Sequence, residues 1–154
     1  MQGLLPYFSF QGRANRQRFW ITNLTIFVFY FLGALIFGAL ARIPVVGIFA
    51  GLVLIVVVLA ALVAVLANSA RRLHDRGKSA WWTLLFQGVP ILFGFLGAAV
   101  AAGGGGEGAS GLFALLSLPI SILAFVALGC LKGTAGPNPY GSDPLAPAME
   151  EVFA

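Results

Sequence analysis

The most highly charged stretch of this 154-residue chain is Arg71-Arg72-Leu73-His74-Asp75-Arg76-Gly77-Lys78-Ser79-Ala80-Trp81-Trp82, which separates two long apolar segments. It holds the only histidine of the chain and five of its charged side chains. Elsewhere charge is scarce, because 60% of all residues are hydrophobic and only 9% are charged, whereas soluble domains carry roughly a quarter charged residues. The stretch therefore indicates a polar hinge between membrane-spanning helices.

Four long uncharged runs lie between the charged residues, at 19–41, 43–70, 79–106 and 108–131. Each exceeds the ~20 residues that a helix needs to cross the hydrocarbon of a bilayer. We therefore predict an all-α integral membrane four-helix bundle that forms a single domain over residues 1–154. Its spans are expected at about 19–41, 45–69, 80–102 and 111–131, with a hinge at 70–79 and a C-terminal tail at 132–154.

The basic residues divide unequally between the two sides that four spans define. With the N-terminus inside, Arg42 alone lies outside, and inner segments of membrane proteins are enriched in Lys and Arg. We therefore predict that both termini are cytoplasmic and that the hinge and tail form a polar cap there. Because the basic residues flank spans, the net charge of +4 does not indicate nucleic acid. The inner basic residues are Arg13, Arg16, Arg18, Arg71, Arg72, Arg76, Lys78 and Lys132.

An alternative for the first run is a secretory signal peptide. Three arginines precede it, and Ala39-Leu40-Ala41 resembles a cleavage site. Its apolar part is longer than the about 7–15 residues of a typical signal sequence. We therefore expect the run to remain as a span.

Local signals predict where the helices begin and end. Asn15 is expected to cap the first helix and Ser79 the third, because side chains of these types accept backbone N–H groups. Pro44 suits the first turn of the second helix, where a missing N–H costs nothing. Gly77 suits the end of that helix.

The connections also carry predictions. The short link at 42–44 makes the first two helices antiparallel neighbours, and glycine-rich residues 103–108 predict a flexible connector. Aromatic residues 4–10 are expected to lie at the membrane interface. Pro90 predicts a kink in the third span, and the turn-forming residues 133–144 predict an ordered loop.

Polar and small residues inside the spans are expected to serve packing. Gly47 and Gly51 form a G-x-x-x-G pair that lets helices approach closely; we favour packing within the chain over a dimer seam. Cys130 is expected to be a small buried hydrophobe. The remaining polar residues are expected to join helices: Asn23, Asn68 and Gln87.

Three segments resemble the bacterial membrane-protein family known as domain of unknown function 805. They are Gly12-Arg13-x-x-Arg16-x-x-Phe19-Trp20, Arg72-Leu73-His74-Asp75-x-Gly77-Lys78-Ser79 followed by Trp81-Trp82, and Gly133-Thr134-x-Gly136-x-Asn138-x-x-Gly141-x-Asp143-Pro144. Ala80 stands where the family commonly has glycine. The resemblance implies a four-helix protein of the bacterial inner membrane, and it implies no activity.

Asp75 is an unexpected residue at a helix C-terminus, because its charge opposes the helix dipole. We therefore hypothesise a partner from the N-terminal segment, either Arg13 or Arg16. The alternative is a solvated i,i+3 pair with Arg72, worth a few tenths of a kcal/mol.

The candidate binding site consists of residues that the three segments place on the cytoplasmic side. Basic residues beside tryptophans favour anionic phospholipid headgroups or a membrane-protein partner, so we predict a lipid- or protein-binding assembly module. That the basic residues only set the orientation remains open. The candidate residues are Arg13, Arg16, Arg71, Arg72, His74, Asp75, Lys78, Trp81, Asn138 and Asp143.

An enzyme acting on lipid headgroups is the second hypothesis. It would use the region of His74 and Asp75, with Ser79 or Thr134 as nucleophile. We expect no metal and no cofactor, because His74 is the only histidine and Cys130 is remote in the sequence. Transport of ions is not indicated, since the spans contain no acidic or basic residue.

Overall fold

The structure, a computed structural model, describes residues 5–146. Residue 4 of the predicted interface segment and residues 147–154 of the predicted tail lie outside this range. Within it the regular secondary structure is helical, apart from one isolated bridge between Asn138 and Gly141. Four helices are long and apolar enough to cross a membrane, which confirms the predicted all-α class and the number of candidate spans. The elements are η1 (Leu5–Tyr7), α1 (Arg16–Leu40), α2 (Val46–Asp75), η2 (Leu84–Gly88), α3 (Val89–Ala102), α4 (Gly106–Ala124) and η3 (Phe125–Cys130).

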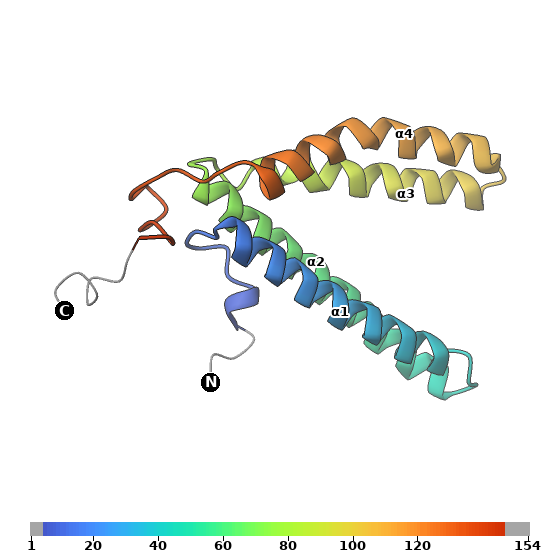
Figure 1. Ribbon diagram of the computed structural model, residues 1–154. Coiled ribbons are helices and arrows are strands. Elements are labelled where there is room, and N and C mark those ends of the chain that lie inside the picture. Colours follow the sequence, from blue (N-terminus) through green and yellow to red (C-terminus); the bar gives the residue numbers. More distant parts are fainter. Residues whose placement is uncertain (1–4, 147–154) are drawn as a thin grey trace.

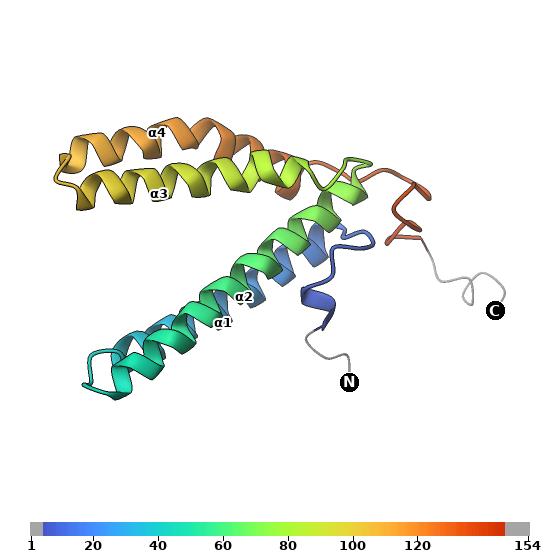
Figure 2. The ribbon, with the colours of Figure 1, turned by 180° about the vertical axis from the view of Figure 1, so that it is seen from behind.

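The helices pair as two antiparallel hairpins. Helix α1 packs along α2, and α3 packs along α4, as predicted for the first pair from its short link. The hairpins diverge from a common region and form an open bundle (Figures 1 and 2). In that region η3 contacts α1 and α2. We call it the hinge end; it comprises residues 5–20, 67–83 and 127–146.

Some of the predicted helix boundaries are confirmed. Asn15 Oδ1 accepts the Arg18 N–H at 2.8 Å, and Gly77 follows α2 with φ of +66°. Ser79 Oγ accepts the Trp81 N–H at 3.4 Å, but the residues that precede η2 and α3 are Thr83 and Gly88, so Ser79 does not cap the third helix as predicted. The expectation for Pro44 is wrong, because α2 begins at Val46. The reason is that Val45 has φ of +67°, a left-handed conformation that cannot continue a helix.

The glycine segment after α3 forms a tight turn and not a long flexible connector. Gly104 and Gly106 have φ of +82° and +74°, which residues with a side chain rarely adopt. The Gly105 N–H donates to the Val100 carbonyl at 2.9 Å. Helix α4 therefore begins at Gly106, earlier than the predicted start of the fourth span near residue 111.

Both helices of the second hairpin are irregular toward the hinge end. A π-helical turn, η2, directly precedes Pro90, where the sequence predicts a kink, and the Val89 N–H donates to the Leu84 carbonyl five residues back. The fourth span also ends in π-helical turns, η3. Such turns often mark functional sites.

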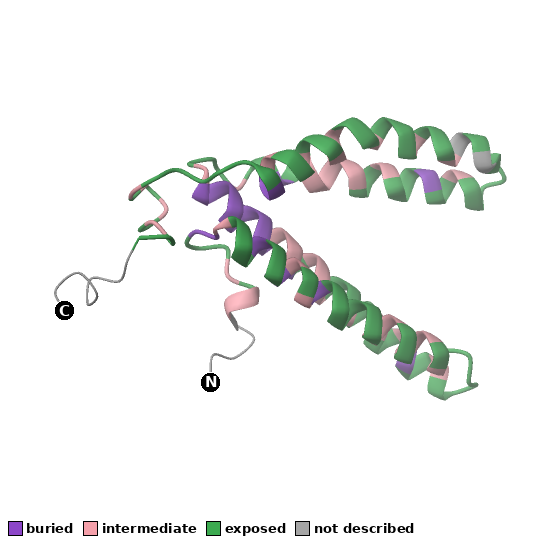
Figure 3. Cartoon of the chain, in the orientation of Figure 1, coloured by how far each residue is buried: buried purple, intermediate pink, exposed green. Residues whose placement is uncertain are grey.

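Burial is concentrated at the hinge end, as Figure 3 shows. All residues of α2 from 67 to 75 are buried, and Phe19, Leu73 and Leu128 form an apolar cluster beside them. The predicted hinge at 70–79 therefore begins with buried helix, residues 70–75 of α2. Along the hairpins large apolar side chains are exposed, as lipid-facing surfaces require: Phe29, Ile48, Phe95 and Leu115 are examples.

Candidate functional site at the hinge end

Asp75, the last residue of α2, binds two arginines. Its Oδ1 accepts from Arg13 Nε at 3.1 Å, and its Oδ2 accepts from Arg72 Nη1. These three side chains are at most 4% exposed. The predicted Arg13 partner is confirmed, and the alternative pair with Arg72 forms as well. Arg16 is not a partner of Asp75, because its Nη1 donates to the Cys130 carbonyl at 3.3 Å.

The C-terminal end of η3 is capped by side chains of α1 and α2 and by Arg76, which follows α2. A helix end leaves its last four carbonyls without partners and partly negative, so donors with positive charge stabilise it. Arg72 thereby joins the fourth span to the Asp75 network. Five consecutive carbonyl oxygens accept from side chains: Ala127 from Arg76, Leu128 and Leu131 from Arg72, Gly129 from Trp20, and Cys130 from Arg16.

Cys130 itself is exposed, so the expectation of a buried cysteine is wrong. Its carbonyl is the group that contacts Arg16. The expectation that amides join helices is confirmed for Asn68, which donates to the Phe19 carbonyl at 3.0 Å, and for Gln87, which donates to Ser69 Oγ at 2.6 Å. It is wrong for Asn23, whose amide donates to the Phe19 carbonyl within its own helix.

The predicted loop after η3 is ordered and docks on the end of α2. The Thr134 N–H and hydroxyl donate to the Asp75 carbonyl at 2.8 and 3.0 Å. Arg13 Nη2 donates to the Thr134 carbonyl at 2.6 Å and Nη1 to the Gly136 carbonyl at 2.7 Å. Asn138 Nδ2 donates to the His74 carbonyl at 2.9 Å. The loop therefore completes the capping of α2.

His74 is part of the same contact. Its ring stacks on Tyr140, with centroids 4.0 Å apart and planes 4° apart. Its Nδ1 lies 3.2 Å from the Gly12 carbonyl oxygen, and since a carbonyl can only accept, Nδ1 carries the proton. Among residues 5–146 no hydroxyl binds this ring, so the enzyme hypothesis stays a prediction without a nucleophile–base pair to support it.

Asp143 shapes the loop from within. Its Oδ2 accepts the Gly136 N–H and its Oδ1 the Leu145 N–H, both at 2.9 Å. These backbone hydrogen bonds, Leu145 first, lower the pKa of the Asp143 carboxyl, and the nearby Arg13 charge lowers it further. The carboxylate form is thus the form that the folded loop favours.

The ten predicted site residues come together, but they divide into two groups. Most are buried or half-buried and hold the segments of the hinge end together, including Arg71, whose Nη1 donates to the Pro6 carbonyl at 2.9 Å. The residues left accessible to a ligand are Arg16, Lys78 and Trp81. Two further basic residues are exposed at the same end, Arg18 and Lys132.

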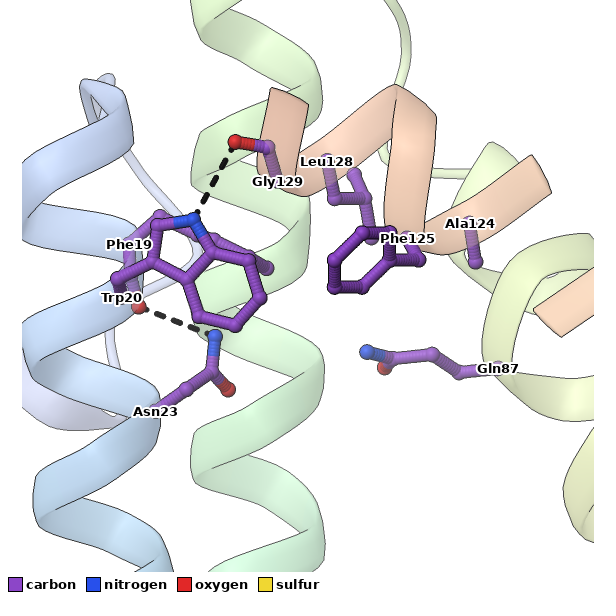
Figure 4. A pocket seen from close by; sticks show the side chains of 8 residues that line it. All are labelled: Phe19, Trp20, Asn23, Gln87, Ala124, Phe125, Leu128 and Gly129. Carbon is purple, nitrogen blue, oxygen red and sulfur yellow. Dashed lines mark hydrogen bonds between the residues drawn. The ribbon is translucent and has the colours of Figure 1, made fainter. Parts of the chain in front are cut away.

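A cavity of about 220 Å³ lies next to this region, between α1 and the second hairpin. Figure 4 shows Trp20 beside it, with the indole N–H donating to the Gly129 carbonyl at 3.3 Å. A Cβ atom on Gly129 would lie 2.6 Å from Trp20 Cζ2, so the indole requires glycine there. The candidate residues from the sequence do not include Trp20, although its position four residues after Arg16 puts both on one face of α1.

Residues 7–142 match the family model described as "Protein of unknown function (DUF805)". The chain belongs to this family. Its matched range includes the Asp75 network and the docked loop up to residue 142, which agrees with the three motifs in the sequence. No solved structure matches the chain.

Relatives of this DUF805 protein occur in Escherichia coli K12. The inner membrane protein YhaI is 33% identical over 145 residues, which cover 92% of this chain and 90% of YhaI. The inner membrane protein YhaH is 28% identical, with 92% and 91% covered. The uncharacterized protein YiiR is 32% identical, with 88% and 86% covered. The chain is thus a DUF805 membrane protein similar to proteins of the bacterial inner membrane.

Proposed function

We propose that the protein is a binding module of the bacterial inner membrane that holds anionic lipid headgroups at its hinge end, with both termini cytoplasmic. The observation that carries the proposal is the set of basic side chains that the fold leaves exposed there: Arg16, Arg18, Lys78 and Lys132. Basic residues near an anionic membrane surface contribute about 1 kcal/mol each.

The charge balance supports this proposal. Within residues 5–146 the hinge end has eight Lys and Arg residues, and its acidic residues are Asp75 and Asp143. Asp75 is already bound by two arginines, and Asp143 by two backbone N–H groups. The exposed cations therefore have no carboxylate partner among the described residues. The negative charge of a lipid phosphate can balance theirs.

The orientation is proposed on the same residues. Four spans put the N-terminal segment, the hinge and the C-terminal loop on one side, and the excess of basic residues favours the cytoplasm. Exposed Trp81 and Trp82 beside Lys78 suit the headgroup region.

The test is the lipid that remains bound when the protein is purified in a mild detergent. We expect enrichment of anionic over zwitterionic phospholipid in the wild type. The variant Arg16→Gln/Arg18→Gln/Lys78→Gln/Lys132→Gln should lose this enrichment. Each of its four substitutions should weaken the binding of anionic lipid by about fivefold, the equivalent of about 1 kcal/mol. Equal retention of both lipid classes by the wild type would refute the proposal.

Two controls separate charge from other effects. Arg42→Gln removes a cation at the opposite end of the first hairpin and should leave the enrichment unchanged. Arg16→Lys/Arg18→Lys keeps the charge and should keep the lipid. Because basic residues also direct insertion, labelling of the exposed Cys130 by an impermeant maleimide, in intact and broken cells, reports whether the orientation is preserved.

A further inference from the structure

We infer that one anionic phospholipid binds between the two hairpins, with an acyl chain in the cavity beside Trp20 and its phosphate at Arg16 and Lys132. The inference rests on the proposed function for the headgroup, and it adds a defined site for the chain. The walls of this site are named in Figure 4.

The wall of the cavity has the chemistry of an acyl-chain site. The lining is largely apolar: Phe19, Trp20, Ala124, Phe125, Leu128 and Gly129, with the amides of Asn23 and Gln87. Its volume of about 220 Å³ corresponds to roughly seven groups of the size of a water molecule. Since the wall belongs to helices apolar enough to span the membrane, hydrocarbon and not bulk water is the solvent that reaches it.

The cations lie where the headgroup of a lipid with a chain in the cavity would be. Arg16, Trp20 and Asn23 are spaced i, i+4 and i+7, so they lie along one face of α1. With a rise of about 1.5 Å per residue, Asn23 lies roughly 10 Å deeper than Arg16 along the helix. A ligand that touches this face thus meets a cation, then an aromatic ring, then an apolar cavity. That order is the order of phosphate, glycerol backbone and acyl chain in a phospholipid.

The opposite wall leads to a second cation. Phe125, Leu128 and Gly129 belong to η3, and Lys132 follows two residues after its end. The Arg16 Nη1 atom binds the Cys130 carbonyl at 3.3 Å, which places the guanidinium of α1 against the end of η3. Arg16 is nevertheless exposed, so the remaining N–H groups of its guanidinium can bind a phosphate.

The amide side chains of Asn23 and Gln87 provide polar groups in the cavity, deeper in the membrane than the cations. Asn23 Nδ2 donates one hydrogen to the Phe19 carbonyl at 3.0 Å, which leaves its second hydrogen for an ester carbonyl of the lipid. Figure 4 shows the side chains of Asn23 and Gln87 on opposite walls of the same space.

The arrangement of the hairpins leaves room for such a ligand at their junction. The hairpins contact each other through η3, which packs on α1 and α2, and through η2, where Gln87 binds Ser69 of α2; the long helices then diverge. The space between two diverging apolar surfaces in a membrane must be filled, because an empty gap loses the dispersion contacts of its walls. A lipid held at its headgroup by the cations fills that space next to the junction.

The test is native mass spectrometry of the detergent-purified full chain, titrated with dioleoyl phosphatidylglycerol or dioleoyl phosphatidylcholine. We expect one phosphatidylglycerol to remain bound to the wild type at energies that remove phosphatidylcholine. Ala124→Leu should fill the cavity and remove the contacts of the acyl chain with its walls, so the variant should release phosphatidylglycerol at the energies that remove phosphatidylcholine. Asn23→Leu, on the opposite wall, should act in the same direction, so the conclusion does not depend on the folding of one variant.

The outcomes distinguish this site from the proposed function. If Ala124→Leu and Asn23→Leu both fold and still hold phosphatidylglycerol like the wild type, the cavity site is refuted. Should anionic enrichment then be lost only when the four exposed cations are changed, headgroup binding stands alone. If the lipid instead survives removal of the cations and is lost on filling the cavity, the chain site stands and the proposed function fails.

Discussion

Replacing Asp75 by asparagine should destabilise the protein strongly. The carboxylate is the partner of two guanidinium groups, and the side chains of Arg13, Arg72 and Asp75 are 2%, 0% and 4% exposed. Asparagine keeps the shape but leaves both cations buried without a counter-charge. Removing one partner of a buried ion pair costs about 3–5 kcal/mol. For a chain of this size about 1 kcal/mol shifts the Tm by 2–4 °C, so Asp75→Asn should lower it by at least about 6 °C.

The assay is thermal unfolding of the detergent-purified protein, followed by tryptophan fluorescence. A double-variant cycle with Arg13→Gln isolates the charge interaction. Once residue 75 is neutral, the buried charge of Arg13 has no counter-charge, and replacing Arg13 by glutamine removes that unpaired charge. The loss of unfolding free energy in Asp75→Asn/Arg13→Gln should therefore be smaller than the sum of the two single losses, by about 0.5–3 kcal/mol. Asp143→Asn is the control, since that carboxylate faces backbone N–H groups at the surface of the loop.

Two results would contradict this reasoning. A decrease in Tm of less than about 2 °C for Asp75→Asn would mean that the two arginines are neutralised or solvated in another way. Strict additivity in the cycle would mean that Arg13 serves the loop carbonyls of Thr134 and Gly136 and gains nothing from Asp75.

Three further predictions follow from the same contacts. Gly133→Ala should lower the Tm by several degrees, because the new Cβ would overlap the Asp75 carboxylate. Gly111→Ala lies within α4, where a Cβ meets open space, and should not lower the Tm, since alanine favours a helix over glycine. Tyr140→Ala should remove the stack on His74, worth about 0.5–1.5 kcal/mol beyond its buried area, and shift the His74 ring protons in NMR spectra, whereas Tyr140→Phe should leave both unchanged. The contribution of Asp143 is present above its unfolded pKa and is lost as pH falls through its lowered folded pKa, so the Gly136 amide resonance should titrate in that acidic range in the wild type and not in Asp143→Asn.

The sequence predicts much of the architecture because the helices and their ends depend on neighbouring residues in the chain. The four apolar runs follow from length and hydropathy alone, and the Asn15 cap and the end of α2 at Gly77 follow from local backbone requirements. The Asp75–Arg13 pair was predictable for a different reason: an acidic residue at a helix C-terminus is locally unfavourable, and the structure supplies the distant partner that compensates it.

The remaining features depend on groups that the sequence does not distinguish. The hydrogen bonds that cap η3 are made to backbone carbonyls, which every residue has, so nothing in residues 127–131 identifies them as acceptors for Arg16, Arg72 and Arg76. The same limit explains the error for Cys130, where the backbone and not the thiol makes the contact. The requirement for Gly133 also becomes clear only when the Asp75 carboxylate is placed beside it.

The arginines of the hinge end therefore have two physical roles that composition cannot separate. Arg13 and Arg72 are inside the fold and bind Asp75 and main-chain carbonyls, while Arg16 and Arg18 remain exposed beside the spans. The buried pair can form only when the N-terminal segment, the end of α2 and the loop after η3 lie on one side of the membrane. The network thus requires an even number of spans between each pair of these segments, so that all three lie on the same side of the membrane. If the exposed cations bind lipid phosphates as proposed, the two sets should respond differently to mutation: changes in the buried set should lower stability, and changes in the exposed set should reduce the amount of bound lipid.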